Sequence, residues 1–151
     1  MNNWFLISSA ILSFLGMVFH GFIGGKMYKT NINKSNLEPL GKTLSLFSWQ
    51  FHTIFLFVAS CTLFYISSNP EFSIAAYPII YMNILGAIYF FILGIGNREV
   101  LKMPGAILMG AIALLAWFGI WEYKSICSNS NYNFKYIKIV YLNDWNFVLE
   151  C

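Results

Sequence analysis

The chain has 151 residues, of which 58% are hydrophobic and only 10% are charged. A soluble domain has about 45–50% apolar and about 25% charged residues, so the composition excludes a disordered chain and an ordinary small soluble domain. Aromatic residues make up 19% of the chain, which is typical of lipid-facing surfaces and interfacial belts. The net charge of +3 is too small and too dispersed for a nucleic-acid partner. We therefore expect an integral membrane protein whose main partner is the lipid bilayer.

Four long apolar runs predict an all-α membrane protein, a four-transmembrane-helix bundle with a short C-terminal tail. The expected spans are residues 4–23, 43–67, 73–95 and 104–121, each long enough for a hydrocarbon core of about 30 Å at a rise of about 1.5 Å per residue. The first run lacks a basic N-terminal segment and a small-residue cleavage site, so we expect a retained helix and not a cleaved signal peptide.

The lysine and arginine residues are distributed unequally between the expected connections. Residues 24–42 and 96–103 hold six of the nine, whereas the connection at Asn69–Pro70–Glu71 holds none. Cytoplasmic loops of membrane proteins carry an excess of these residues. The sequence therefore predicts that the first and third connections lie in the cytoplasm and that both termini lie outside it.

The chain changes character after residue 124, which divides a bundle (1–124) from a linker and tail (125–151). Residues 125–133 are rich in Ser and Asn and are expected to form a polar linker. Two β-branched and aromatic stretches, 134–142 and 145–149, flank Asn-Asp and predict a β-hairpin. The alternative is a partly ordered tail lying on the lipid headgroups, because an isolated hairpin is marginal in water.

The three cysteines fall in two different parts of the chain. Cys61 falls within the second span, where we expect an inert core residue. Cys127 and Cys151 bracket the tail, and a disulfide between them would close it in an oxidising periplasm. The spacing does not fit a metal site such as Cys-x-x-Cys, so no metal is predicted.

His20 and His52 are the ionisable side chains well inside the spans, apart from Cys61, which makes them functional candidates. Both are expected toward the cytoplasmic side, offset by roughly 6 Å along the membrane normal. Two imidazoles on facing helices could handle a proton, bind a small ligand, or ligate haem b. The simpler hypothesis is hydrogen-bonded packing, because the same helix face carries only small and polar residues at spacings of three and four: Ser9, Ser13, Gly16, His20 and Gly24.

Three further polar residues are candidates for the same site. Gln50 and Thr53 flank His52, and Asn83 lies near the middle of the third span. If these side chains converge with the histidines, they would line a small polar pocket that opens toward the cytoplasm. Helical spacing cannot show whether they do.

Small residues at helical spacing predict close helix packing. The fourth span carries Ala106, Gly110 and Ala113, and the first carries Gly16 and Gly24. Small residues let helix backbones approach closely, either within the bundle or between subunits. Aromatic residues at the end of the fourth span predict an outer interfacial belt, namely Trp117, Trp121 and Tyr123.

The chain lacks the motifs of the common enzyme classes: a nucleotide-binding loop, a His-Glu-x-x-His helix, a nucleophile elbow or paired carboxylates. The expected spans contain no Asp or Glu, whereas ion-coupled carriers usually need at least one. We therefore predict a structural or accessory membrane protein, assembling with itself or with a larger complex. One alternative is a redox or small-ligand protein that uses His20 and His52; another is a subunit of an oligomeric pore or transporter.

The segments His20-Gly21-Phe22-Ile23-Gly24-Gly25 and Trp49-Gln50-Phe51-His52 resemble a group of small bacterial inner-membrane proteins. Members of that group have four predicted helices, a His-Gly pair at the end of the first and a Trp/His cluster in the second. The resemblance covers residues 4–121 and implies a four-helix fold, but no activity. The tail after Ser125 departs from it.

Overall fold

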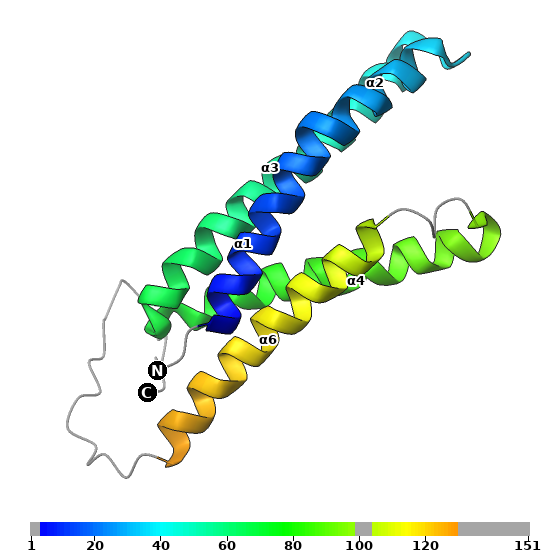
Figure 1. The fold of residues 1–151 in the computed structure, drawn as a ribbon. Helices are drawn as coiled ribbons and strands as arrows, with labels where there is room; N and C mark the ends of the chain where they lie inside the picture. Colours follow the sequence, from blue (N-terminus) through cyan, green and yellow to red (C-terminus); the bar gives the residue numbers. More distant parts are fainter. Residues whose placement is uncertain (1–3, 99–103, 130–151) are drawn as a thin grey trace, which may run out of the picture.

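The computed structural model describes residues 4–98 and 104–129, except for the side chains of 126–129. The β-hairpin expected at 134–149, Cys151 and the side chain of Cys127 therefore lie outside the described residues. The described elements are all helical (Figure 1). They are α1 (Trp4–Val18), the π-helical turn η1 (Phe19–Gly24), α2 (Gly25–Lys34), α3 (Pro39–Ser68), the 3₁₀ helix η2 (Pro70–Ala75), α4 (Ala76–Gly96) and α6 (Gly105–Asn129).

The sequence prediction of an all-α, four-transmembrane-helix bundle is confirmed. Four helical segments are long and apolar enough to cross a membrane. They are Trp4–Lys34, Pro39–Ser68, Pro70–Gly96 and Gly105–Ser125. The protein is thus a multi-pass membrane protein.

The first connection is much shorter than the polar sequence suggested. Residues 24–42 were expected to form a loop, but the helix runs without a break to Lys34 and a new one starts at Pro39. Lysine favours helices, and proline is well placed in a first turn. The Lys42 ammonium donates to the carbonyl oxygen of Asn33 at 3.1 Å and ties the two helices together beside the turn. At the other end of the chain, α6 continues to Asn129, into the segment expected as linker.

The four spans form two antiparallel hairpins that meet at one end and diverge toward the other. Figure 1 shows α1–α2 running alongside α3, and α4 alongside α6, with the two pairs separating toward α2. Helix α1 lies at the centre, because it packs against both α3 and α6. A Cβ at Gly16 would lie 2.8 Å from Leu108, and one at Gly119 would lie 2.6 Å from Leu6, so glycine permits this close contact of α1 with α6.

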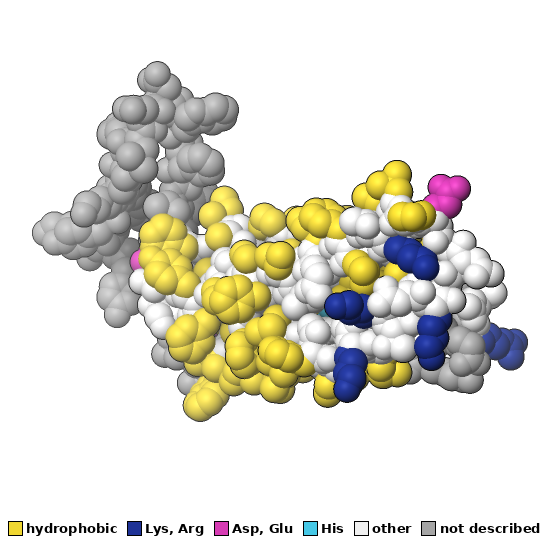
Figure 2. All heavy atoms as spheres, turned by 90° about the horizontal axis from the view of Figure 1, so that it is seen from above, with side chains coloured by type: hydrophobic (Ala, Val, Ile, Leu, Met, Phe, Trp, Pro, Cys, Tyr) yellow, Lys and Arg dark blue, Asp and Glu magenta, His cyan; other side chains and the backbone are white. Residues whose placement is uncertain are grey.

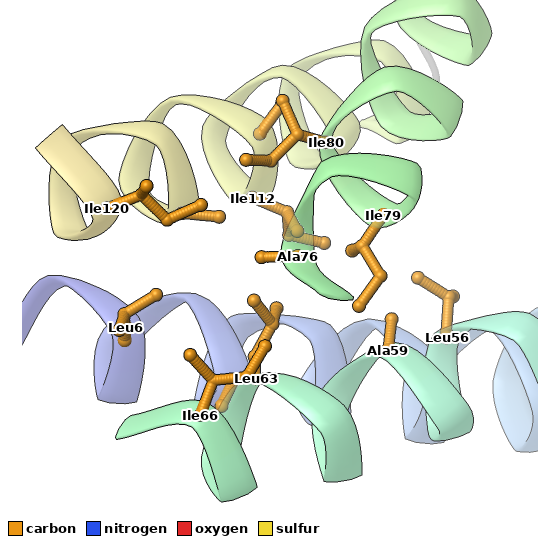
Figure 3. Packing of buried hydrophobic residues seen from close by; sticks show 13 residues of the cluster. Leu6, Leu56, Ala59, Leu63, Ile66, Ala76, Ile79, Ile80, Ile112 and Ile120 are labelled. Atoms are coloured by element: carbon orange, nitrogen blue, oxygen red, sulfur yellow. The ribbon is translucent and has the colours of Figure 1, made fainter. Parts of the chain in front are cut away.

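The apolar core lies near the end where the hairpins meet (Figure 3). Side chains of all four spans contribute to it, and Leu63, Ile66, Ile80 and Ile112 are fully buried. Lipid tails are as apolar as these side chains, so close van der Waals packing holds the helices together rather than exclusion from water.

Serine hydroxyls add polar contacts between the helices of this core. Ser9 Oγ donates to the carbonyl of Ile112 at 2.9 Å, and Ser13 Oγ to the carbonyl of Leu56 at 3.0 Å. Ser60 Oγ returns a bond to the carbonyl of Ala10 at 2.9 Å. The small-polar face expected on the first span therefore bonds α1 to both of its neighbours.

The surface is divided by residue type along its length. Figure 2 shows apolar side chains concentrated toward one end and lysines gathered at the other. At the lysine-poor end, Trp4 and Trp121 are exposed, and Trp117 meets Tyr77 edge to face at 6.4 Å. The ammonium of Lys124 lies 5.6 Å from the centre of the Tyr77 ring. Tryptophan and tyrosine side chains grouped at one end of a helical bundle are typical of an aromatic interfacial belt.

Candidate functional site

The candidate site joins α1–α2 to α3 at the level where the two hairpins separate. It consists of His20 from η1, Tyr28 from α2, and Trp49, His52 and Thr53 from α3; we call these five residues the histidine–tryptophan cluster. Antiparallel pairing of two continuous helices brings residues around 20 opposite residues around 50. The two segments that the sequence singled out thus become neighbours.

Three rings of the cluster form a continuous stack. The Trp49 indole lies between the other two, with its ring centre 3.9 Å from that of His20 and 4.3 Å from that of Tyr28, and with interplanar angles of 12° and 14°. Offset stacked pairs of this kind stabilise by about 0.5–1.5 kcal/mol beyond their buried area. Because both faces of the indole are covered, Trp49 serves to fill the space between the helices.

Hydrogen bonds fix the orientation of His20. Its Nδ1 lies 2.9 Å from Thr53 Oγ1, and the Thr53 hydroxyl also donates to the carbonyl of Trp49 at 3.3 Å. A hydroxyl has one proton, so both contacts are hydrogen bonds only when His20 Nδ1 carries a hydrogen and donates it to Thr53. This network assigns the neutral His20 to the tautomer with a free Nε2.

The backbone around His20 is adapted to the contact with Trp49. The Trp49 Nε1–H donates to the carbonyl oxygen of His20 at 3.2 Å, within a π-helical turn whose i→i+5 pattern departs from the α-helical one. A Cβ at Gly24 would lie 2.9 Å from the indole, and one at Gly21 would lie 3.0 Å from the Thr53 methyl group. Glycine at these two positions gives the rings of α3 the space they occupy.

His52 is held differently from His20. Its ring meets the His20 ring edge to face at 4.9 Å and faces Phe55 at 6.1 Å. The ring nitrogens of this partly buried side chain form no hydrogen bond with any described residue. His52 is therefore the histidine of the cluster in which neither ring nitrogen is hydrogen-bonded to a described residue.

The 4.9 Å separation of the two rings corrects the expected offset in depth. The expected offset assumes that residues 23 and 43, the ends of the predicted spans, lie at the same depth in the membrane. Both helices continue well past those points, to Lys34 and back to Pro39, so the ends of the apolar runs do not mark equal depth. The histidines lie side by side.

Two of the expected pocket residues do not join the cluster. Gln50 is exposed, and Asn83 is fully buried on α4, in the other hairpin. The Asn83 side-chain amide donates to the carbonyl of Ile79, one turn earlier, at 2.8 Å, while its Oδ1 has no partner among the described residues. The structure brings His20, His52 and Thr53 together but not the full set.

Tyr28 is the cluster member that the sequence analysis did not include. Its signal was spacing, since His20, Gly24 and Tyr28 follow one another at intervals of four. We had assigned residue 28 to a loop, where helical spacing carries no information.

The expected packing residues have unequal environments. Gly16 and Ala113 are buried, Ala106 is partly buried, and Gly24 meets Trp49. Gly110 has no atom within 4 Å of the position where a Cβ would stand, so it does not mark a close contact. Cys61 was expected in the core, but it is exposed because it lies on the outer side of α3.

Two surface hollows lie away from the histidines. One of about 260 Å³ is lined by Ala10, Ile11, Phe14, Ser60, Cys61 and Phe64, and one of about 40 Å³ lies beside Tyr77 and Trp117. Among residues 4–98 and 104–125, no three His, Cys, Asp or Glu side chains are grouped for a metal ion. A porphyrin between the histidines would require the two rings, whose centres are 4.9 Å apart, to separate.

Comparison with known proteins identifies no relative: no family model, curated protein or solved structure matches this chain.

Proposed function

We propose that this protein is a structural or accessory component of a bacterial inner-membrane assembly, which presents a stiff helical arm on the cytoplasmic side. The arm comprises residues 25–50, which are α2, the turn and the first part of α3. The observation that carries the proposal is the position of the histidine–tryptophan cluster, at the base of this arm. The Trp49 indole N–H, the Thr53 hydroxyl and His20 Nδ1 form hydrogen bonds within the protein.

The length of the first hairpin supports the presence of an arm. The first helical segment, Trp4–Lys34, has 31 residues and so is about 46 Å long, against a hydrocarbon core of about 30 Å. The second, Pro39–Ser68, has 30 residues. The α4–α6 hairpin diverges from this pair (Figure 1), so the arm consists of two helices that pack mainly against each other.

The cluster supplies the contacts that a two-helix arm needs at its base. Isolated helix pairs lack the packing that holds a bundle together. The stack on Trp49 and the His20–Thr53 hydrogen bond replace some of that packing, at the level where α6 no longer covers α1. The topology, with both termini outside the cytoplasm, follows from the positive-inside rule.

The test separates this role from ligand chemistry. Purified protein is examined by absorption spectroscopy before and after reduction with dithionite, and by native mass spectrometry from nanodiscs formed directly from membranes. We expect a featureless visible spectrum and a mass above the 17.3 kDa of one chain. His20→Ala and His52→Ala should lower stability only. A strictly monomeric protein with a Soret band that vanishes in both variants would overturn the proposal.

A second function is favoured by His52, whose ring nitrogens lack a partner among the described residues. A half-buried imidazole beside a second one could bind a small ligand or pass a proton. This alternative predicts that His52→Ala abolishes binding or proton movement while His20→Ala mainly reduces stability. An oligomeric pore, the other alternative, would raise membrane permeability on overexpression.

A further inference from the structure

We propose that the arm, residues 25–50, binds anionic phospholipid headgroups of the leaflet from which it emerges. The inference does not depend on whether the arm also joins an assembly. It rests on two features that the mechanical role of the cluster does not require: the charge of the arm and its exposed apolar stripe.

The arm is the basic part of the molecule. It carries Lys26, Lys29, Lys34 and Lys42 against the single Glu38, a net charge of +3. The first three ammonium groups belong to exposed side chains, whereas Lys42 is tied to Asn33. Figure 2 shows the lysine and arginine side chains of this face gathered toward one end of the molecule. The described charges at the opposite end are Glu71, Glu122 and Lys124, with a net charge of −1.

The arm also presents a stripe of large apolar side chains. On α3, Leu40, Leu44 and Phe47 follow at intervals of four and three, and Phe51 continues the stripe just beyond the arm; their exposed fractions are 69%, 56%, 66% and 59%. Met27 on α2 is 65% exposed. Counted from the end of α3 at Ser68, the stretch of about 20 residues that a helix needs to cross a membrane reaches back to about residue 49, so Leu40 and Leu44 lie beyond it. An arm standing in water would leave this stripe unfavourably hydrated.

An anionic lipid surface satisfies both features together. The boundary between headgroups and acyl chains accepts an apolar helix face, while the phosphates attract lysines. The lysine stems can lie along apolar surface with their ammonium groups at the phosphates. The divergence of the two hairpins (Figure 1) also requires that at least one of them be tilted in the membrane. A tilt of the longer pair brings its arm toward the leaflet.

The first experiment measures lipid preference. Protein is reconstituted into nanodiscs of phosphatidylcholine and phosphatidylglycerol in equal amounts, then extracted in mild detergent, and the retained lipids are counted by native mass spectrometry. We expect retention of phosphatidylglycerol over phosphatidylcholine, reduced by up to roughly five-fold for each lysine removed. The combined change Lys26→Gln, Lys29→Gln and Lys34→Gln should abolish the preference.

Two matched variants keep this result interpretable. The same three positions changed to Arg retain the charge and should retain the preference, and Lys124→Gln, at the opposite end, should leave it unchanged. The preference should also weaken as salt is raised, because exposed charges are screened. Equal retention of both lipids by the wild type, or an unchanged preference in the Gln variant, would overturn the proposal.

A second experiment locates the stripe. With Cys61, Cys127 and Cys151 replaced by Ser, a spin label is attached at Leu44→Cys or, as a control at the tip, at Asn36→Cys. Collision with oxygen should dominate at position 44 and collision with a water-soluble nickel chelate at position 36. A water-exposed label at 44 would mean that the arm stands clear of lipid and that its partner is an acidic protein. Lipid preference in a monomer would support this inference while counting against the proposed assembly.

Discussion

The Thr53 hydroxyl forms the hydrogen bond between His20 and α3, so removing this hydroxyl tests the contact most directly. We expect Thr53→Val to lower the free energy of unfolding by about 0.6 kcal/mol, and by at most about 1.7 kcal/mol, the range of hydrogen bonds between membrane helices. Steric trapping in bicelles measures this quantity. The control is Thr43→Val, because the Thr43 hydroxyl bonds only to Pro39 of its own helix at 3.1 Å. Equal losses in both variants would refute a specific role for the contact.

Trp49 is expected to matter more than either histidine. It stacks on two rings and bonds to the carbonyl of His20, so Trp49→Ala should cost about 3–5 kcal/mol. Trp49→Phe keeps an aromatic ring but lacks the N–H, and should show a smaller loss. Thermal unfolding followed by circular dichroism provides the measurement. A tryptophan variant no less stable than His52→Ala would show that the stack does not hold the arm.

The packing face of α1 could be predicted from single residues, but the partner of His20 could not. The face formed by Ser9, Ser13, Gly16 and His20 indicated which side of α1 packs. The partner of His20, however, depends on how two helices are shifted along each other, and that shift follows from where the helices end in space. Asn83 shows the same limit, because a polar residue in an apolar helix indicates burial but not which neighbour it meets.

At the scale of single helices, two glycines of α6 test how closely α6 packs against α1, because one lies at the contact and the other does not. A Cβ at Gly119 would approach the backbone nitrogen of Leu6 to 3.2 Å and its side chain more closely, whereas Gly110 has open space. We expect Gly119→Ala to destabilise the α1–α6 contact by about 1–3 kcal/mol. Gly110→Ala should be neutral or stabilise by up to about 1 kcal/mol, because alanine favours the helix.

The same unfolding assay as for Thr53 compares the two glycine variants. Similar effects at both positions would show that helix propensity, and not close packing, governs α6.

Apolar runs predicted the four long helices, because about 20 apolar residues are needed to cross lipid. They did not predict how far the helices continue. Lysines and asparagines between residues 24 and 34 suggested a loop, yet a polar helix pairs with α3 there. Hydropathy reports which residues tolerate lipid, whereas helix length also depends on a neighbouring helix against which a polar segment can pack.

At the scale of the whole molecule, the orientation in the membrane can be tested with two exposed positions. Asn36 lies in the turn at the tip of the arm and Glu71 lies in η2, at the other end of α3. In a background without the native cysteines, Asn36→Cys should react with a membrane-impermeant maleimide only in inside-out vesicles, and Glu71→Cys only in intact cells. Labelling of both from one side would exclude the four-span arrangement, and the reverse pattern would invert the topology.

The π-helical turn at 19–24 has a consequence for insertions and deletions. Each residue of an α-helix advances by about 100°, so positions four apart drift by about 40° per step. Gly16, His20, Gly24 and Tyr28 are spaced by four, and the wider π turn compensates part of this drift, which keeps α2 in phase with α3. A π turn holds one more residue than an α-helical turn, so deleting one residue between 19 and 24 would convert it to an α-helical turn and keep the rest of the arm in phase. The same deletion within α2, ahead of Tyr28, would rotate the following residues by about 100° about the helix axis and move Tyr28 away from Trp49. The π turn therefore makes residues 19–24 the segment in which the arm tolerates the loss of one residue.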